Sequence, residues 1–384
     1  MRIHLSAGEH SGDMHAANLA RALRDLEPDI ELTGMGGPLM RAAGVDVRWD
    51  PTAESTIGFS EALVNYRHLR LILREVISSF AERRPDAVVW VDFGGFNLML
   101  AGACRRLGIP VVCVFSPSAW AYGRKRAELM AGCVTRLAAV LPFEAEFYRS
   151  YGLEVTFVGH PLLDLVRADT DAASYRSALG LAGGEEIVAL LPGSRRREII
   201  MMLPLMLEAV TRLLAAGRRI RPVLPLAPSV PRGLVEGILA RFDAEVAVTA
   251  GCAYDALSAS IMALISSGTA TLEAAILGVP MVSCYRVSAL SYMIYRLLRN
   301  PADRSKPVMT ALPNLVAARR VVPELLQNEL TADRMAAEAT RILDDAAYRE
   351  RMRGDLAAVK QALGEPGASR RIAGIVRQVA AAGR

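Results

Sequence analysis

Short runs of apolar residues alternate along this 384-residue chain with longer segments in which apolar side chains recur every three or four positions. The runs are typical of buried strands and the periodic segments are typical of amphipathic helices. The pattern predicts strands at 2–7, 30–37, 87–95, 109–118, 186–194, 221–227, 244–251, 260–268 and 279–285. It predicts helices within 8–26, 37–44, 58–80, 96–108, 203–217, 232–243 and 269–278, and mostly helix from about residue 330.

Strands that alternate with helices indicate parallel sheets covered by helices on both faces, which is the α/β class. The alternation runs through two successive series, and each series has a glycine-bearing turn between a strand and a helix. We therefore predict two Rossmann-like, doubly wound domains, with their junction near 160–175.

Charge and composition narrow the classes of function. The net charge is +5 and the pI is about 9.1, which suits an anionic ligand or an anionic membrane surface. Aromatic residues are sparse and form no basic, aromatic patch, so nucleic-acid binding is not expected. Five dispersed cysteines and five dispersed histidines predict reduced thiols in a cytosolic protein and no metal site.

The hydrophobic segments are too short or too interrupted to predict a membrane span. The most apolar stretch, 87–103, has Asp92 near its centre, where a carboxylate inside a bilayer would be very unfavourable. The first residues lead directly into a strand, so no signal peptide is expected.

The sequence "LLPGSRRREI" at 190–199 ends a buried strand in a turn rich in positive charge. Backbone N–H groups after Gly193, the Ser194 hydroxyl and the Arg195 guanidinium suit phosphate oxygens at the start of a helix. The P-loop pattern is absent. The alternative interpretation is a surface turn with solvated arginines.

A second turn with similar chemistry follows the strand at 260–268. Ser267 or Thr269 is predicted to cap the helix that begins after Gly268 and to donate to phosphate. Glu273 is expected to accept hydrogen bonds from ribose hydroxyls, and the alternative is a solvated side chain on an ordinary capped helix. Two such turns in one half of the chain suit a diphosphate.

The first loop, "SAGEHSGDMH", holds Glu9, His10 and Ser11 between Gly8 and Gly12, and Asp13 directly follows Gly12. It lacks the G-x-G-x-x-G fingerprint of dinucleotide sites, and its acidic residues repel phosphate, so we expect it to contact sugar hydroxyls. Asp13 is predicted to cap the helix that this loop opens.

Asp92 ends a continuous apolar strand and precedes a pair of glycines. A carboxylate in such a place is expected to have a raised pKa and to act as a general base. The alternative is a cap for the next helix. No second carboxylate stands beside Asp92 in the sequence, which favours direct single-displacement transfer over acid–base hydrolysis.

The segment 58–80 is helix-periodic and unusually apolar, with arginines at 67, 70 and 74 among its apolar residues. Such a helix can lie in a bilayer interface with its arginines on lipid phosphates. The alternative is a helix of the protein core.

Seven stretches follow one another along the chain, and they read "SAGEHSGDMHAANLARAL", "GMGGPLMRAAG", "SPSAWAYGRKR", "LPFEAEFYRSYGLEVTFVGHPLLD", "LLPGSRRREI", "SSGTATLEAAILGVPMVSCYR" and "LPNLVAARRVVPELLQ". These stretches resemble the motifs of the lipid-A-disaccharide synthases, in order and with matching spacing from residue 3 to about residue 330.

The resemblance implies a GT-B glycosyltransferase, in which two Rossmann-like halves face a cleft. The expected bounds are 1–168, 169–362 and a final helix, 363–384, that packs back on the first half or on a partner subunit. It implies an inverting reaction without metal ion or cofactor. The donor would be UDP-2,3-diacylglucosamine, the acceptor 2,3-diacylglucosamine 1-phosphate (lipid X), and the products a β(1→6) disaccharide 1-phosphate and UDP.

Because both substrates carry acyl chains, the resemblance also implies a peripheral enzyme on the cytoplasmic face of the inner membrane. It shifts the interpretation of helix 58–77 towards membrane contact. It further suggests a homodimer.

Residue by residue, the resemblance implies that Asp92 is the base and that Arg195 contacts the diphosphate. The remaining positions implied in substrate binding are Glu9, Ser11, Gly193, Ser194, Ser267, Gly268, Thr269, Glu273, Arg286, Asn314 and Gln327. Two positions depart from the family pattern. The familiar D-x-P-D-F-N is here "DFGGFN", with Gly95 in place of a second acid, and Gly123 replaces a polar residue, so the contacts to the acceptor are expected to differ.

Other functions remain open on the residues alone. Another UDP-sugar enzyme of the same fold, such as a UDP-N-acetylglucosamine epimerase or a cell-wall glycosyltransferase, would share the nucleotide turns but not need the apolar 58–77 segment. A non-catalytic UDP-binding protein at a membrane surface would not need both Asp92 and Arg195.

Overall fold

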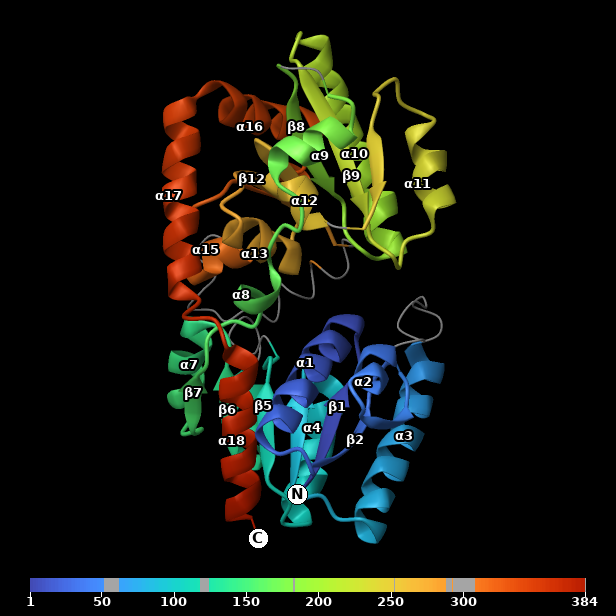
Figure 1. Ribbon diagram of the computed structural model, residues 1–384, viewed down its shortest axis with the longest axis vertical. Coiled ribbons are helices and arrows are strands. Elements are labelled where there is room, and N and C mark those ends of the chain that lie inside the picture. The colour runs from blue at the N-terminus through green and yellow to red at the C-terminus, as the bar shows by residue number, and fades with distance from the viewer. Residues whose placement is uncertain are drawn as a thin grey trace. The chain divides into compact units, whose positions relative to one another are not determined.

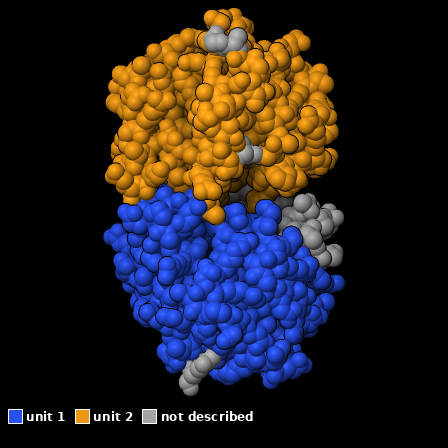
Figure 2. Space-filling model, viewed as in Figure 1, with its two compact units in different colours: residues 1–164, 363–384 blue, residues 165–362 orange. Residues whose placement is uncertain are grey.

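The computed structural model describes residues 1–51, 62–117, 124–181, 184–251, 253–287, 292 and 308–383. The chain divides into two compact units, which are Met1–Asp164 with Leu363–Arg384, and Leu165–Ala362 (Figure 2). Each unit is built on its own parallel sheet, and this confirms the predicted α/β class with two Rossmann-like domains.

The sheet of the first unit has seven strands in the order β3-β2-β1-β4-β5-β6-β7 (Figure 1). The strands are β1 (Arg2–Ala7), β2 (Glu31–Met35), β3 (Asp46–Trp49), β4 (Ala87–Val91), β5 (Val111–Val114), β6 (Arg136–Ala139) and β7 (Val155–Phe157). The winding direction reverses between β1 and β4. Open α/β sheets bind ligands at the carboxyl ends of the strands beside such a reversal.

Helices cover both faces of this sheet. They are α1 (His10–Leu26), α2 (Pro38–Ala42), α3 (Ala62–Glu82), α4 (Gly94–Arg106), α6 (Arg124–Cys133), α7 (Pro142–Arg149) and α18 (Ala368–Ala382). The short helix α8 (Leu162–Leu165) spans the boundary between the two units along the chain. The C-terminal helix α18 returns to the first unit and packs against α1 and strands β4, β5 and β6 (Figure 1).

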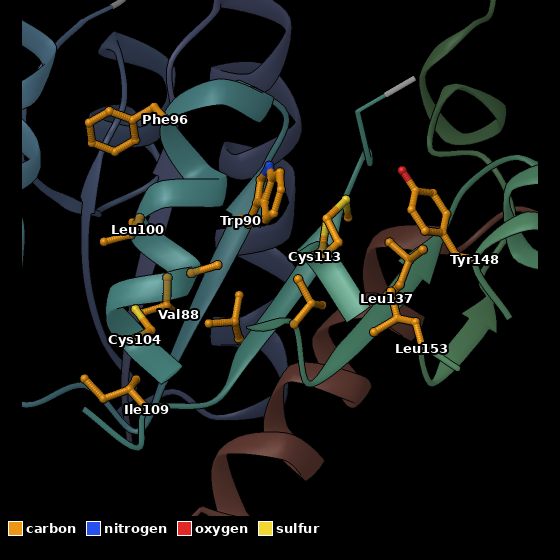
Figure 3. Close-up of a cluster of buried hydrophobic side chains, with 14 of the residues drawn as sticks. Val88, Trp90, Phe96, Leu100, Cys104, Ile109, Cys113, Leu137, Tyr148 and Leu153 are labelled. Atoms are coloured by element: carbon orange, nitrogen blue, oxygen red, sulfur yellow. The ribbon is translucent and has the colours of Figure 1, made fainter. Parts of the chain in front are cut away.

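A large apolar cluster fills the space between the sheet and α3, α4 and α6. Trp90 and Cys113 contribute to it from β4 and β5, and Leu100 contributes from α4 (Figure 3). Continuous apolar strands such as β4 are typical of a sheet that is buried on both faces.

The same cluster buries one face of α3. Ile72, Leu73, Val76 and Phe80 are buried in it. The expectation that the apolar face of 58–77 lies in a membrane is therefore wrong for Ile72, Leu73 and Val76, because they pack on the sheet. Residues 58–61 lie outside the described residues, as does Gly123.

The sheet of the second unit has six parallel strands in the order β10-β9-β8-β11-β12-β13. The strands are β8 (Glu186–Leu191), β9 (Ile220–Leu226), β10 (Ala247–Ala250), β11 (Met262–Ser266), β12 (Met281–Tyr285) and β13 (Glu324–Leu326). The winding reverses between β8 and β11, so this sheet repeats the topology of the first one.

The helical segments of the second unit are α9 (Ala172–Ala178), α10 (Arg196–Ala215), α11 (Arg232–Leu239), α12 (Ala253–Ser258), α13 (Thr269–Ile276), α15 (Leu312–Val316), the 3₁₀ turn η4 (Gln327–Glu329), α16 (Ala332–Asp344) and α17 (Ala346–Ala362). The helix predicted at 203–217 begins earlier, at Arg196, and continues through Pro204. Each of the predicted helices α10, α11 and α13 is the first helix after its strand, which is β8, β9 and β11 respectively.

Candidate active site

The first candidate site lies at the carboxyl ends of β1 and β4. These strands pair in parallel, with Ala7 opposite Val91, so the loop that starts at Gly8 and the turn that starts at Asp92 leave the sheet side by side. A side-chain carbon on Gly12 would lie 3.8 Å from Cβ of Asp92. The structure therefore brings the N-terminus of α1, with Glu9 at the N-cap and Ser11 in the first turn, next to the proposed base.

Asp92 has an unusual backbone conformation. Its φ is 51° and that of the next residue, Phe93, is 54°, so both lie in the left-handed region. For residues other than glycine this conformation costs about 1 to 2 kcal/mol each and is concentrated at functional sites. Helix α4 has Phe93 as its N-cap residue, so Asp92 does not occupy the capping position that the alternative interpretation gave it.

A buried side chain that the sequence reasoning missed holds this turn. Asn97 donates from Nδ2 to the main-chain oxygens of Asp92 (2.8 Å) and Ser6 (3.1 Å). Its Oδ1 accepts a hydrogen bond from the Ser6 hydroxyl at 2.5 Å. The signal was present in the sequence, because "DFGGFN" keeps the final Asn of the family pattern.

Asp13 has a different role from the predicted one. The residue at the N-cap of α1 is Glu9, and its main-chain oxygen accepts from the N–H of Asp13. The buried Asp13 carboxylate accepts hydrogen bonds from the N–H groups of Gly37, Leu39 and Met40 at 2.8 to 3.0 Å. It caps α2 and not its own helix, because the fold brings the start of α2 against α1.

A second carboxylate, also missed, is present in the same unit. Glu144 is buried in the first turn of α7 and accepts from the Ser116 hydroxyl at 3.1 Å. Burial raises the pKa of Glu144 to about 7, against the lowering effect of Ser116 and of the Leu141 and Val140 amides. Burial, Glu144, Cys133 and Asp92 raise the pKa of the Cys113 thiol, which places both carboxylates near β5.

The second candidate site lies at the carboxyl ends of β8 and β11, which also pair in parallel. Gly193, with φ of 118°, begins the turn after β8. The N–H groups of Ser194 and Arg195 donate to Oε2 of Glu198 at 3.1 and 3.2 Å. The Arg195 side chain is 68% exposed, with its guanidinium 3.6 Å from Glu198 Oε1.

The turn after β11 leads into α13. Gly268 is its N-cap, and no side chain caps it there, so the predicted cap by Ser267 or Thr269 is wrong. The Ser267 hydroxyl instead donates to the main-chain oxygen of Thr310 at 3.0 Å. Gly268 and Thr269 are exposed at this edge of the sheet.

Glu273 lies one turn further along α13. It accepts from the Tyr254 hydroxyl at 3.3 Å, and burial raises the pKa of its carboxyl group while that hydrogen bond lowers it. The side chain is therefore half-buried and not the fully solvated carboxylate of the alternative interpretation.

The remaining predicted residues are Arg286 and Gln327, which directly follow β12 and β13, and Asn314 in α15. The Arg286 guanidinium donates to the main-chain oxygens of Gln327 (3.2 Å) and Leu330 (2.6 Å), which joins the ends of these strands. Asn314 is fully buried. Its amide is saturated by Val321, Val322 and Glu324, so its observed contacts are internal.

Two further properties bear on the chemistry. In the part of the chain that the structure describes, no group of three or more His, Cys, Asp or Glu side chains could hold a metal ion. Among the same residues, no helix is both long and apolar enough to cross a membrane.

Comparison with known proteins identifies the family. The family model described as lipid-A-disaccharide synthetase matches residues 3–376. The chain belongs to the lipid-A-disaccharide synthase family. Two curated lipid-A-disaccharide synthases illustrate the similarity. That of Geobacter sulfurreducens is 41% identical over 382 residues, covering 98% of this chain and 97% of the relative. That of Myxococcus xanthus is 40% identical over 386 residues, covering 100% and 98%.

Solved structures show that this chain shares its fold with a UDP-GlcNAc 2-epimerase and with MurG. UDP-GlcNAc 2-epimerase from Neisseria meningitidis, bound to UDP-GlcNAc, aligns with a TM-score of 0.66 at 14% identity, covering 98% of this chain and all of that one. MurG from Acinetobacter baumannii aligns with a TM-score of 0.58 at 15% identity, covering 98% and 99%. The fold is that of GT-B enzymes, and the family makes this chain a glycosyltransferase of lipid A biosynthesis.

Proposed function

We propose that this chain transfers the diacylglucosaminyl group of UDP-2,3-diacylglucosamine to the 6-hydroxyl of 2,3-diacylglucosamine 1-phosphate (lipid X). The products are UDP and the β(1→6)-linked disaccharide 1-phosphate. The observation that carries the proposal is family membership over residues 3–376. The described residues support it with a carboxylate at one sheet reversal and two phosphate-suited turns at the other.

In the proposed reaction, the Asp92 carboxylate takes the proton from the acceptor 6-hydroxyl. The oxygen attacks C1 of the donor sugar, and the bond from C1 to the diphosphate oxygen breaks with its electron pair leaving on UDP. A single displacement of this kind inverts the configuration at C1, from α to β. Glu9 and Ser11, at the adjacent N-terminus of α1, contact sugar hydroxyls in this proposal.

The second unit binds the leaving group in this proposal. Arg195 and the turns at Gly193–Ser194 and Ser267–Thr269 neutralise the diphosphate, and Glu273 accepts from the ribose. Arg286, Asn314 and Gln327 support the donor side, and the saturated amide of Asn314 gives it a positioning role. Stabilising charge on the departing UDP is electrostatic catalysis and needs no metal ion or cofactor.

We also propose a peripheral location on the cytoplasmic face of the inner membrane, since both lipid substrates reside in a bilayer. The outer face of α3 supports it, because Arg67, Arg70, Leu71 and Arg74 are exposed there. A homodimer is proposed on the family resemblance alone, and light scattering of the purified chain tests it.

The product assay decides the function. We expect the purified full chain, given UDP-2,3-diacylglucosamine and lipid X in mixed micelles, to form UDP and a disaccharide whose β(1→6) linkage is visible by NMR. The Asp92→Asn variant should lose nearly all turnover and still bind UDP. Turnover of UDP-N-acetylglucosamine instead would favour an epimerase, and UDP binding without any turnover would favour a non-catalytic protein.

A further inference from the structure

The main chain at Asp92 is fixed at both of its polar groups. Its N–H donates to the main-chain oxygen of Val114 on β5 at 3.2 Å, and its carbonyl oxygen accepts from Nδ2 of Asn97 at 2.8 Å. The second contact comes from a side chain that is only 1% exposed, so bulk water does not compete for this hydrogen bond.

The hydrogen bonds also determine which way the Asn97 amide points. Its nitrogen faces two carbonyl oxygens, those of Asp92 and Ser6, which can only accept. Its oxygen faces the Ser6 hydroxyl, which is free to donate. One residue therefore ties the end of β1 to the end of β4 and leaves no unsatisfied amide group.

Packing around the turn leaves it little room to relax. The Phe93 ring leaves no room for a side chain at Gly8, because a side-chain carbon there would lie only 2.2 Å from Cδ1 of Phe93. A side-chain carbon on Gly94 would lie 2.8 Å from Cβ of Pro117. The turn is thus wedged between the loops that follow β1 and β5, and Asn97 supplies the side-chain hydrogen bond that holds its left-handed backbone.

We propose that Asn97 is a positioning residue for the transfer reaction, acting by fixing the direction in which Asp92 presents its carboxylate, with Ser6 orienting the Asn97 amide. This inference rests on the proposed role of Asp92 as the base. Asparagine is required because aspartate at position 97 would offer an oxygen to the Asp92 carbonyl and add a charge beside the base. Alanine would leave the two carbonyls without their donor.

The test compares kcat, KM and UDP affinity in the full chain, using the disaccharide product assay and calorimetry with UDP. Asn97→Ala should lower kcat about 100-fold, the scale expected when a reacting group moves by about 1 Å, with UDP affinity unchanged. Ser6→Ala should lower kcat about tenfold, since the amide keeps its bond to Asp92 but loses its orienting partner.

Two control variants separate positioning from general stability. Asn18→Ala removes an asparagine whose Oδ1 accepts from Arg21 on the surface of α1, and it should leave kcat unchanged. Val88→Ala loosens the core of β4 away from the turn and should lower the melting temperature without changing kcat. A fall in kcat for Val88→Ala equal to that of Asn97→Ala would overturn the inference.

A mutant cycle tests whether Asn97 acts through Asp92. In an Asp92→Glu background, where the longer side chain already displaces the carboxylate, Asn97→Ala should cost less than tenfold in residual kcat. The same 100-fold loss in both backgrounds would place the action of Asn97 elsewhere and overturn the inference. If Asn97→Ala does not fold, the Ser6→Ala variant decides, since an unchanged kcat there is incompatible with the inference.

Failure of the proposed function gives a different result from failure of the positioning role of Asn97. Full activity of Asp92→Asn removes Asp92 as base, whatever Asn97 does. Inactive Asp92→Asn combined with wild-type kcat in a folded Asn97→Ala removes only the positioning role.

Discussion

The Glu198 side chain packs against the backbone of Gly193 in the turn after β8. A side-chain carbon on Gly193 would lie 2.3 Å from Oε2 of Glu198, so the carboxylate occupies the space that glycine leaves open. From there it accepts from the N–H groups of Ser194 and Arg195. An N3 glutamate that bonds back to the N-cap is a common helix cap. Here it also fills the anion site that the sequence assigns to the donor diphosphate, so the two are expected to compete.

Replacing Glu198 with Ala should therefore raise the affinity for UDP and lower the stability of the fold. We expect UDP to bind about fivefold more tightly, equivalent to about 1 kcal/mol, because no carboxylate has to be displaced. The free energy of unfolding should fall by about 1 kcal/mol because α10 loses its cap. Calorimetry and thermal unfolding measure the two effects. Glu208→Ala, on the exposed face of the same helix, is the control, and weaker UDP binding in Glu198→Ala would contradict the competition.

Arg195 is expected to matter more for the reaction than its neighbours in the arginine run. Arg195→Ala should lower kcat by about 100- to 1,000-fold, because in the proposed reaction the guanidinium stabilises charge on the departing diphosphate. Arg195→Lys should recover part of this, since an ammonium keeps the charge but not the two-pronged contact. Arg197→Ala, which removes another exposed arginine of the same run, is the control in the same steady-state assay. Equal losses at both positions would mean that only the local charge matters.

Glu144 predicts a pH dependence of stability. Its folded pKa of about 7 lies above the ordinary 4.5, so the folded state keeps a proton that the unfolded state loses between these values. Stability therefore falls as pH rises through this window, by about 3 kcal/mol in total. Glu144→Gln lacks this effect, so its free energy of unfolding relative to wild type should rise by about 3 kcal/mol from pH 5 to pH 8.

Tryptophan fluorescence in urea measures this difference, since Trp49 and Trp90 lie in the same unit as Glu144. Burial lowers the pKa of His4, His15 and His160 to between about 3 and 4, which destabilises the fold as pH falls below 6.5. That effect has the opposite sign but is common to both proteins, so it cancels. A difference that does not vary with pH would show that Glu144 is ionised throughout.

The two faces of α3 predict opposite outcomes for membrane binding. Leu71 is 54% exposed and Val76 is fully buried. Leu71→Ser should weaken partitioning to anionic vesicles by about tenfold, the value of one buried leucine, with no change in melting temperature. Val76→Ser should lower stability by about 3 kcal/mol and leave partitioning of the folded protein intact. Sedimentation with vesicles and thermal unfolding distinguish them, and unchanged partitioning of Leu71→Ser would exclude this face as the contact.

Much of the fold follows from local pattern. The strands β1, β4, β8 and β11 can be recognised in the sequence as apolar runs, because strands buried on both faces are continuously apolar. Four strands were not predicted: β3, β6, β7 and β13. They have only three or four residues each, and β3 is partly exposed, so neither length nor periodicity distinguishes them from loops.

The candidate sites likewise contain residues that the sequence could identify and contacts that it could not. Chemistry-bearing residues at strand ends, Asp92 and Arg195 above all, could be named from the sequence, because parallel strands bring their carboxyl ends to one edge whatever the details of packing. The partners of those residues could not. Asn97 reaches Ser6 across 91 positions, and Asp13 caps a helix 24 positions away.

By itself, then, the sequence determined the α/β class, the two Rossmann-like series, the family and the residues at the strand ends. Only the tertiary structure decided that α3 turns Val76 into the core, that Glu144 is a buried acid and that Glu198 fills the turn at Gly193. The physical reason is that hydrophobic periodicity and turn chemistry are local properties of the chain. Burial, pKa and hydrogen-bond partners depend on which distant segments the fold brings into contact.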